Sequence, residues 1–381
     1  MSADAPPPAR AGNGPPAAAA AAATVLRHTR ERRPGELNLK SCELLHPLIA
    51  LFHAETMRTA SPWDVVAYPI YEDTYAQVAR HLGVPVEELV LCPGSEPAIA
   101  LLVRAFAPIR IVAHAPLFEA WERYAQLYGC TVHPVAPRED ESRLDVADLI
   151  TALRGGPPSL VVLTQPHGHT GQVFGAGEVT ALAEAVSAHD SLLIVDTCYL
   201  AFVAGGEATV QATTGLPHVV RVNSFSKAFG LAGARIAAVA THPDTADYLL
   251  RFNPESALSG IALTLLRAAL RRPEVFASIW TDVRRLRDLL ASKVERALPG
   301  WLARPSGANF VTFDVPSRAQ ADLVYVGLLG RGIRTRNLSG LPGLPAAVRI
   351  SVPSEHAVRC VVDALDGLPG EQDARQGSGG L

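Results

Sequence analysis

The chain has 381 residues, of which 48% are hydrophobic and 19% charged, and its formal net charge is −3 at pH 7. These values are typical of a well-packed globular protein, and they exclude the basic surface that nucleic acids and anionic membranes attract. No apolar run approaches the roughly 20 residues of a membrane-spanning helix. The five cysteines are scattered without CxxC spacing, so we expect reduced thiols in a cytoplasmic protein rather than disulfides or a zinc site.

The two ends of the chain differ from the rest in composition. Residues 1–35 begin with a stretch of Ala and Pro that includes seven consecutive alanines, and residues 370–381 are rich in Gly and polar residues. The first stretch lacks the basic start and the leucine-rich centre of a secretory signal. We therefore expect a disordered tail at each end and exclude both from the fold.

Short apolar runs alternate with amphipathic stretches between about residues 60 and 242. Most of the apolar runs are continuous, which is typical of strands covered on both faces. Predicted helices lie between them at 96–106, 118–129 and 178–189. The alternation predicts a doubly wound α/β domain, in which ligands bind beyond the carboxyl ends of the strands. The predicted strands are 89–94, 109–115, 131–136, 160–165, 192–198, 219–225 and 235–241.

The pattern changes after residue 243. A long amphipathic helix is predicted over 275–298, followed by strands near 308–314 and 348–352 and a last helix near 354–366. This mixture of helices and separated strands predicts a second, smaller α+β domain.

Polar residues gather where the predicted strands end. Gly94, Ser95 and Glu96 follow the first strand and open a helix, whose N–H groups can hold a phosphate, although such a start is more often a simple cap. Asp196 follows four apolar residues, and a buried carboxylate there needs a cationic or donor partner. The remaining polar residues at these strand ends are Tyr199, Ser224, Lys227 and Arg235.

Lys227 stands out because the chain uses arginine almost everywhere else. Only three lysines occur, Lys40, Lys227 and Lys293, against 31 arginines. A lysine amine can lose its proton and attack a carbonyl, whereas a guanidinium stays protonated and forms no imine. A lysine at a strand end, beside serines and a glycine-rich turn, therefore indicates imine chemistry.

Together these residues suit pyridoxal phosphate. This cofactor needs an amine for its aldehyde, a carboxylate for its ring nitrogen, a donor for its phenolic oxygen and a cradle for its phosphate. Lys227, Asp196 and Tyr199 supply the first three. Ser95, Ser224 and Arg235 supply the cradle.

From about residue 37 to 368 the chain resembles the fold type I, class I/II aminotransferases, and most closely their histidinol-phosphate aminotransferase branch. The segment S-F-S-K-A-F-G-L-A-G-A-R, with D-x-x-Y upstream, carries the resemblance. It implies that Lys227 forms the Schiff base, that Asp196 pairs with the pyridine nitrogen and that Tyr199 bonds the phenolic oxygen. It also implies a phosphate site made by Gly94, Ser95, Glu96, Ser224 and Arg235.

The resemblance implies further site residues. In A-Y-P-I-Y, Tyr68 corresponds to the tyrosine that reaches the phosphate of the neighbouring subunit, which implies a homodimer with shared active sites. Phe118 corresponds to the aromatic residue on the cofactor ring, with Trp121 as the alternative and ordinary core packing as the other interpretation of both. Arg349 corresponds to the arginine that binds the substrate carboxylate, unless it is merely solvated, and Asn309 lies near that carboxylate.

The chain departs from the family at the segment N-P-x-N-P-T-G, which here is Q-P-H-G-H-T-G over 165–171. Gly168 replaces the asparagine that bonds the phenolic oxygen, so water, His167 or His169 is left to take its place. An imidazole there predicts a titration step near neutral pH. Near the N-terminus the family's N-E-N-P segment is also absent. Arg336 corresponds to a position that contacts substrate phosphate in the histidinol-phosphate enzymes.

We therefore predict a pyridoxal-phosphate-dependent aminotransferase that converts an amino acid to a 2-oxo acid or aldehyde. Decarboxylation, elimination, cyclisation or oxidation by the same fold is the alternative, and a ligand sensor in a DNA-binding regulator is a third. The resemblance implies a mostly parallel seven-stranded sheet in the large domain. It places an N-terminal arm at 36–60, packed on the small domain, the large cofactor-binding domain at 61–245 and the small domain at 246–369.

Overall fold

The computed structural model describes residues 35–137 and 143–366. The two predicted tails lie outside these ranges, apart from Gly35. All seven strands predicted between residues 60 and 242 are present and form one sheet. They are β2 (Leu89–Cys92), β3 (Arg110–His114), β4 (Thr131–Val135), β5 (Ser159–Thr164), β6 (Leu192–Asp196), β7 (Val219–Ser224) and β8 (Ala237–Thr241).

The strand order in this sheet is β2-β8-β7-β6-β5-β3-β4. Strands β3 to β7 pair in parallel, whereas β8 runs antiparallel to both of its neighbours, β2 and β7. Because β8 runs in the opposite direction, Arg235, just before its start, lies at the same sheet edge as the carboxyl ends of β6 and β7. The predicted α/β class with a mostly parallel seven-stranded sheet is confirmed.

Helices cover both faces of the sheet, as its continuous apolar strands require. One buried cluster joins the strands to α5 (Ser95–Phe106), α6 (Glu119–Tyr128) and α10 (Pro243–Leu250). Another joins the opposite face to α7 (Val146–Arg154) and α8 (Ala176–Ser187). This two-sided burial is what makes the fold doubly wound.

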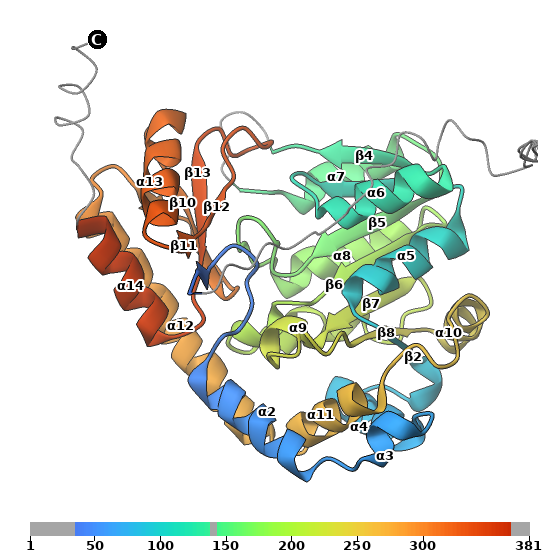
Figure 1. Ribbon diagram of the computed structural model, residues 1–381. Helices are drawn as coiled ribbons and strands as arrows, with labels where there is room; N and C mark the ends of the chain where they lie inside the picture. The colour runs from blue at the N-terminus through green and yellow to red at the C-terminus, as the bar shows by residue number, and fades with distance from the viewer. Residues whose placement is uncertain (1–34, 138–142, 367–381) are drawn as a thin grey trace, which may run out of the picture.

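A second sheet forms the core of a smaller unit beside the first (Figure 1). Its antiparallel order is β12-β13-β10-β9, and α13 (Arg318–Gly330) and α14 (Glu355–Asp366) pack on it. The long helix α12 (Pro273–Ala297) joins the two units, because its first half packs in one core cluster and its second half in the other. The strands are β9 (Leu302–Ala303), β10 (Phe310–Asp314), β12 (Arg336–Asn337) and β13 (Ala347–Ser351).

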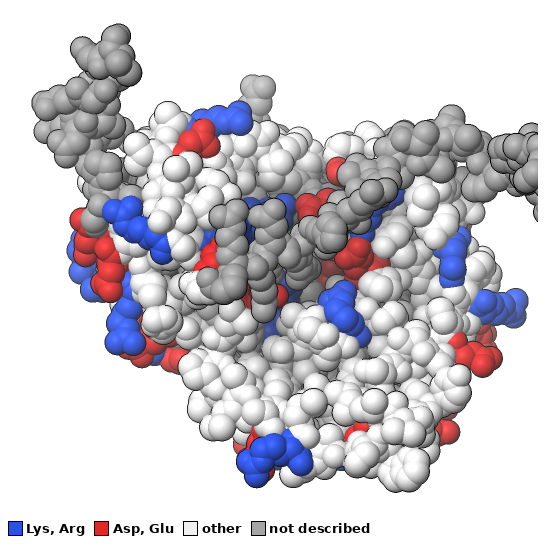
Figure 2. Space-filling view, viewed as in Figure 1, with Lys and Arg blue, Asp and Glu red and all other residues white. Residues whose placement is uncertain are grey.

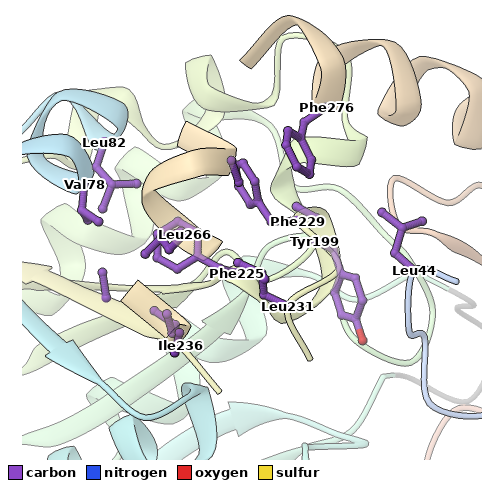
Figure 3. Close-up of a cluster of buried hydrophobic side chains, with 14 of the residues drawn as sticks. Leu44, Val78, Leu82, Tyr199, Phe225, Phe229, Leu231, Ile236, Leu266 and Phe276 are labelled. Carbon is purple, nitrogen blue, oxygen red and sulfur yellow. The ribbon is translucent and has the colours of Figure 1, made fainter. Parts of the chain in front are cut away.

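The N-terminal arm runs between the two units (Figure 1). Its strand β1 (Leu37–Asn38) pairs in parallel with β11 (Ile333–Arg334) of the small unit. Further along, Leu44 and Ile49 enter a cluster of buried phenylalanines that includes Phe225, Phe229 and Phe276 (Figure 3). The helices around this cluster are α2 (Pro47–Thr59), α3 (Trp63–Val66), α4 (Glu72–Leu82) and α11 (Gly260–Leu270). None of the helices within the described ranges is long and apolar enough to cross a membrane.

Candidate active site

A cavity of about 470 Å³ lies where the sheet edge, the small unit and the arm meet. Residues from the ends of β5, β6 and β7, from the start of α5, from the arm and from β12 and β13 line it. Parallel strands place their carboxyl ends at one edge, and this edge is where an open α/β sheet binds ligands. The cavity thus collects most of the side chains that the sequence singled out.

One end of the cavity is built to hold an anion. Ser95, Ser224 and Arg235 line it beside the start of α5. Gly94 has φ 104°, and a Cβ atom there would lie 2.5 Å from Arg235 Nη2, so only glycine lets the guanidinium approach the helix start. Arg235 itself has φ 58°, a conformation that non-glycine residues rarely adopt. Glu96 also lines the cavity, and its carboxylate pairs with Arg123, which the sequence had not indicated as a site residue.

Ser226 also lines the cavity, although it was not singled out from the sequence. Its Oγ atom is buried and has no hydrogen-bond partner among the described residues. A buried hydroxyl without a partner is costly, so a bound ligand oxygen would satisfy it. The available signal was its place as the second serine of S-F-S-K.

The short helix α9 (Phe225–Ala228) brings Lys227 to the wall of the cavity. Its Nζ atom donates a hydrogen bond of 2.6 Å to the carbonyl oxygen of Ser41 in the arm. Asp196 ends the buried strand β6 and accepts a 3.0 Å bond from the N–H of Cys198. Burial raises the pKa of the Asp196 carboxyl, and that N–H and the charge of Lys227 oppose the rise. A protonated ring nitrogen would give this carboxylate the cationic partner that its burial calls for.

Tyr199 follows Asp196 by one turn and also lines the cavity. Its ring packs edge-on against Phe310 of the small unit, with 5.4 Å between ring centroids. Burial raises the pKa of its hydroxyl well above the usual value, so the group keeps its proton and is a hydrogen-bond donor at neutral pH.

Arg349, on β13, is a buried guanidinium that faces the cavity. Nη1 donates 2.6 Å to the carbonyl of Gly168, and Nη2 donates 2.8 Å to the carbonyl of Lys40. Its Nε atom has no partner, and no carboxylate among residues 35–137 and 143–366 pairs with it. A buried guanidinium that lacks a carboxylate partner is a ready site for a ligand carboxylate.

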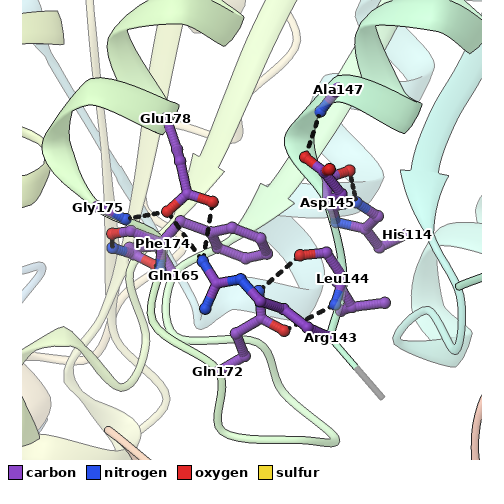
Figure 4. Close-up of polar contacts among 10 residues, drawn as sticks. All are labelled: His114, Arg143, Leu144, Asp145, Ala147, Gln165, Gln172, Phe174, Gly175 and Glu178. Atoms are coloured by element: carbon purple, nitrogen blue, oxygen red, sulfur yellow. Dashed lines mark hydrogen bonds and ion pairs between the residues drawn. The ribbon is translucent and has the colours of Figure 1, made fainter. Parts of the chain in front are cut away.

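The loop that departs from the family is held by side chains of its own (Figure 4). Gln165 takes no part in the cavity, because it donates 2.7 Å to the Phe174 carbonyl and accepts 2.9 Å from the Phe174 N–H. Gln172 makes the same pair of bonds to Leu144. The loop is therefore fixed, and the first family asparagine is replaced by a structural glutamine.

His167 and His169 both line the cavity. His167 Nδ1 lies 3.0 Å from Thr170 Oγ1 and accepts 3.3 Å from the Thr170 N–H. Burial lowers the pKa of His167 to about 3 and that of His169 well below the ordinary value. Lowered pKa values of these two rings act against a titration step near neutral pH, which is the step expected if one of them replaces the family asparagine.

The structure distinguishes between the aromatic residues that the sequence offered as candidates. Phe118 lines the cavity and is 39% exposed, whereas the alternative, Trp121, is buried in the core between α6 and the sheet. Tyr68 is 87% exposed and does not line the cavity of its own chain. Asn309 is fully buried outside the cavity wall, where its Nδ2 donates 3.0 Å to the carbonyl of Cys42.

The mouth of the cavity carries charged pairs. Arg336 pairs with Glu119 at 3.1 Å, and Arg334 pairs with Glu36 of the arm. Lys40 adds a further cation from the arm. Of these residues only Arg336 was assigned to the site from the sequence, because the others reach the cavity through the fold and belong to no recognised motif.

Comparison with known proteins places this site in a family. Residues 52–365 match the family described as aminotransferase class I and II. A histidinol-phosphate aminotransferase of Thermoanaerobacter pseudethanolicus is 30% identical over 315 residues, covering 81% of this chain and 86% of that protein. One from Anaeromyxobacter is 32% identical over 279 residues, covering 72% and 75%. The chain belongs to the class I and II aminotransferases.

Solved structures agree on the fold. Histidinol-phosphate aminotransferase from Sinorhizobium meliloti, in complex with pyridoxal-5'-phosphate, aligns with a TM-score of 0.77 at 23% identity, covering 94% of this chain and 95% of that one. L-threonine-O-3-phosphate decarboxylase from Porphyromonas gingivalis aligns with a TM-score of 0.70 at 20% identity, covering 87% and 98%. The fold is fold type I, and the protein is a pyridoxal-phosphate-dependent aminotransferase.

The residues present fit this cofactor. The orphaned Ser226 hydroxyl and the Arg235 guanidinium against Gly94 suit a phosphate. The buried Asp196 suits a protonated ring nitrogen, and Lys227 supplies the amine for the aldehyde.

Proposed function

We propose that the enzyme removes the amino group of an α-amino acid whose carboxylate binds Arg349. The observation that carries this proposal is the buried Arg349 guanidinium, which lines the cavity and pairs with no carboxylate among the described residues. A bidentate arginine–carboxylate pair fixes both the position and the orientation of the substrate. The amino group would then lie towards Lys227.

The cofactor supplies an aldehyde for the substrate amine and a ring that withdraws electrons from the substrate Cα. Lys227 Nζ is the group that takes and returns the Cα proton, because it lines the cavity at the same sheet edge as Asp196. Asp196 holds the proton on the ring nitrogen, and Tyr199 donates to the phenolic oxygen. Phe118, just before α6, lines the cavity and would pack on the ring.

Arg336 is assigned to the distal end of the substrate. It lines the cavity mouth and its carboxylate partner, Glu119, is more than half exposed. A distal phosphate or carboxylate on the substrate can exchange with Glu119 because an exposed ion pair contributes little free energy. The relatives named for histidinol phosphate act on an amine that carries a phosphate and no carboxylate.

A homodimer with shared active sites is supported by the surface around Tyr68. Trp63, Val65, Val66 and Ile70 are each more than 70% exposed there. The face over α2, α3 and α11 is mostly free of charged residues (Figure 2). An exposed apolar patch of this kind marks an interface, and a second copy would bring Tyr68 towards the partner's phosphate site.

We propose a cytoplasmic location because the cysteines are not paired in disulfides. All five are free thiols, including the buried Cys42 and Cys92. Free thiols are typical of proteins in reducing compartments.

Mixing the purified enzyme with single amino acids tests the proposed reaction. Amino transfer converts the visible band of the bound cofactor to the ultraviolet band of its amine form, and mass spectrometry should find one 2-oxo acid or aldehyde per cofactor. Loss of the visible band without such a product would contradict the proposed amino transfer.

Decarboxylation, elimination, cyclisation or oxidation remains the second candidate because of Gly168. This residue leaves the phenolic oxygen without the family amide, which changes how the electrons of the ring are held. Release of carbon dioxide or uptake of oxygen under the same conditions, with no amine form of the cofactor, would favour this candidate over amino transfer.

A further inference from the structure

The guanidinium of Arg349 lies over the ring of Phe310. The Cζ atom of Arg349 is 4.8 Å from the centre of this ring, and both side chains are buried. A cation within about 6 Å of a ring centre is attracted by the negative face of the ring, and the attraction grows as water is excluded. Arginine suits such a contact because its flat group stacks on an aromatic face. The burial of both partners therefore makes this a contact of the stronger kind.

The small sheet brings the two side chains together. Strands β10 and β13 pair antiparallel, with Phe310 opposite Ser351 and Thr312 opposite Arg349. Phe310 and Arg349 are thus diagonal neighbours on one face of the sheet, a separation that an aromatic ring and a long side chain can span. Thr312 donates 2.6 Å to the carbonyl of His169 on the same side. The contact therefore follows from the register of the two strands.

The ring and the backbone hold different parts of the guanidinium. Nη1 donates to the carbonyl of Gly168 at 2.6 Å, and Nη2 donates to the carbonyl of Lys40 at 2.8 Å. The N–H groups of a guanidinium lie in its plane, so these carbonyls set its direction within the plane, whereas the ring contacts its face. A substrate carboxylate needs the same in-plane donors and competes with the carbonyls for them. The ring contact uses no donor, so substrate binding does not compete with it.

The same ring contacts the tyrosine assigned to the cofactor. The rings of Phe310 and Tyr199 are 5.4 Å apart between centroids and meet at 89°, an edge-to-face arrangement. Tyr199 and Arg349 both line the cavity, whereas Phe310 is fully buried behind them and is not among the residues of the cavity wall. Phe310 therefore acts on a ligand only through the side chains that it contacts.

We propose that Phe310 is a positioning residue for the substrate carboxylate: its ring holds the plane of the Arg349 guanidinium so that the donors of Arg349 face the cavity. The proposal rests on the proposed function, because it takes Arg349 as the group that binds the carboxylate. Arginine is a flexible side chain, and a guanidinium that is held in place before binding loses less conformational entropy when the carboxylate arrives. Loss of the ring should therefore weaken carboxylate binding.

Binding of glutarate to the holoenzyme tests the proposal. Glutarate has a carboxylate at each end and no amine, so it can bind Arg349 without reacting. Isothermal titration calorimetry reports the dissociation constant and the stoichiometry separately, so misfolded protein lowers the stoichiometry and not the affinity. Phe310→Leu removes the ring and keeps an apolar side chain. It should raise the dissociation constant of glutarate roughly 3- to 30-fold, the equivalent of one partly to fully desolvated cation–π contact.

Matched variants separate positioning from packing. Phe310→Tyr keeps the face of the ring and should restore most of the wild-type affinity. Phe313→Leu is the control, because Phe313 is fully buried on the same strand but packs against Trp301 in the core of the small unit, with 5.9 Å between ring centroids. This variant should lower the midpoint of thermal unfolding, as Phe310→Leu does, and leave the affinity for glutarate unchanged.

A double variant shows whether the ring acts through the guanidinium. Adding Phe310→Leu to Arg349→Gln should weaken glutarate binding no further, because the ring then has no guanidinium to hold. An equal loss from Phe310→Leu in the wild-type and Arg349→Gln backgrounds would overturn the proposal. Unchanged affinity in Phe310→Leu, or an equal loss in Phe313→Leu, would overturn it too.

Failure of the proposed function has a different signature. Wild-type enzyme that binds no glutarate, or binding that Arg349→Gln leaves unchanged, defeats the carboxylate site at Arg349 and this proposal with it. Because wild type and Arg349→Gln are measured before any Phe310 variant, the two failures are distinguishable.

Discussion

The side-chain nitrogen of Lys227 lies 2.6 Å from the carbonyl oxygen of Ser41, although 186 residues separate them in the sequence. The next carbonyl along the arm, that of Lys40, accepts from Arg349 at 2.8 Å. Adjacent backbone groups thus contact the amine that binds the cofactor and the guanidinium assigned to the substrate. Substrate binding must compete with both contacts, so the arm is coupled to the occupancy of the site.

Arg349→Lys should impair use of the amino acid substrate while leaving the cofactor bound. Lysine keeps the charge but loses the planar pair of donors, so we expect kcat/KM to fall by roughly 10- to 150-fold, the equivalent of one charged hydrogen bond. Steady-state kinetics measures it. Arg267→Lys is the control, because Arg267 contacts Thr74 and Thr264 outside the cavity. Equal losses in both variants would point to general destabilisation and against the assignment.

Tyr68→Phe should weaken cofactor binding without changing the fold. If the hydroxyl reaches the phosphate of the partner subunit, losing one charged hydrogen bond raises the dissociation constant roughly 10- to 150-fold. Tyr71→Phe is the matched control, because its hydroxyl bonds to Leu258 of the same chain. Sedimentation that shows an active monomer at assay concentration would rule out a shared site.

Gly168→Asn should return the family amide to the phenolic oxygen. The position has room, since a Cβ there would meet only Thr164 and Tyr199, each at 3.9 Å. The added donor should lower the titration midpoint of the visible band, whereas Gly168→Ala, which adds a methyl group alone, should not. A midpoint that moves equally in both variants would show that backbone changes, and not the amide, are responsible.

Acid should destabilise the enzyme partly through His167. Its pKa is about 3 in the folded protein, against an ordinary value near 6.5 in the unfolded chain, so below about pH 6.5 the unfolded state binds the extra proton. This group therefore costs about 2 kcal/mol of stability at pH 5, and the loss levels off near pH 3.

The variant His167→Gln removes the loss of stability that is linked to the His167 proton, and it keeps hydrogen-bonding groups near Thr170. As the pH falls from 7 to 5, the midpoint of thermal unfolding should fall further in the wild type than in the variant. Parallel curves over that range would show that the imidazole is protonated equally in both states. His133→Gln, at a position that is exposed on β4, serves as the control.

All seven strands of the large sheet could be predicted from the sequence because they are buried on both faces. The runs 160–163 and 192–195 are continuously apolar, and such a run predicts a strand without any knowledge of its neighbours in the sheet. The reversed direction of β8 was not predictable in this way, because an apolar run is the same in either direction. The two-residue strands β1, β11 and β12 carry too few residues for any period to show.

The site was predicted where side chains carry the chemistry and was missed where the backbone does. Lys227, Asp196 and Arg349 are recognisable by residue type and spacing. The carbonyls of Lys40 and Ser41 have no residue preference, and they reach the site only because β1 pairs with β11 across the chain.

The central claim is that Lys227 binds the cofactor. Borohydride reduction of the holoenzyme, followed by proteolysis and mass spectrometry, should place one pyridoxyl group on Lys227 and none on the same position in Lys227→Arg, which should still fold. That variant should also lose turnover, because arginine keeps the charge and forms no imine. Label on Lys40, which also lines the cavity, or on Lys293 would contradict the account.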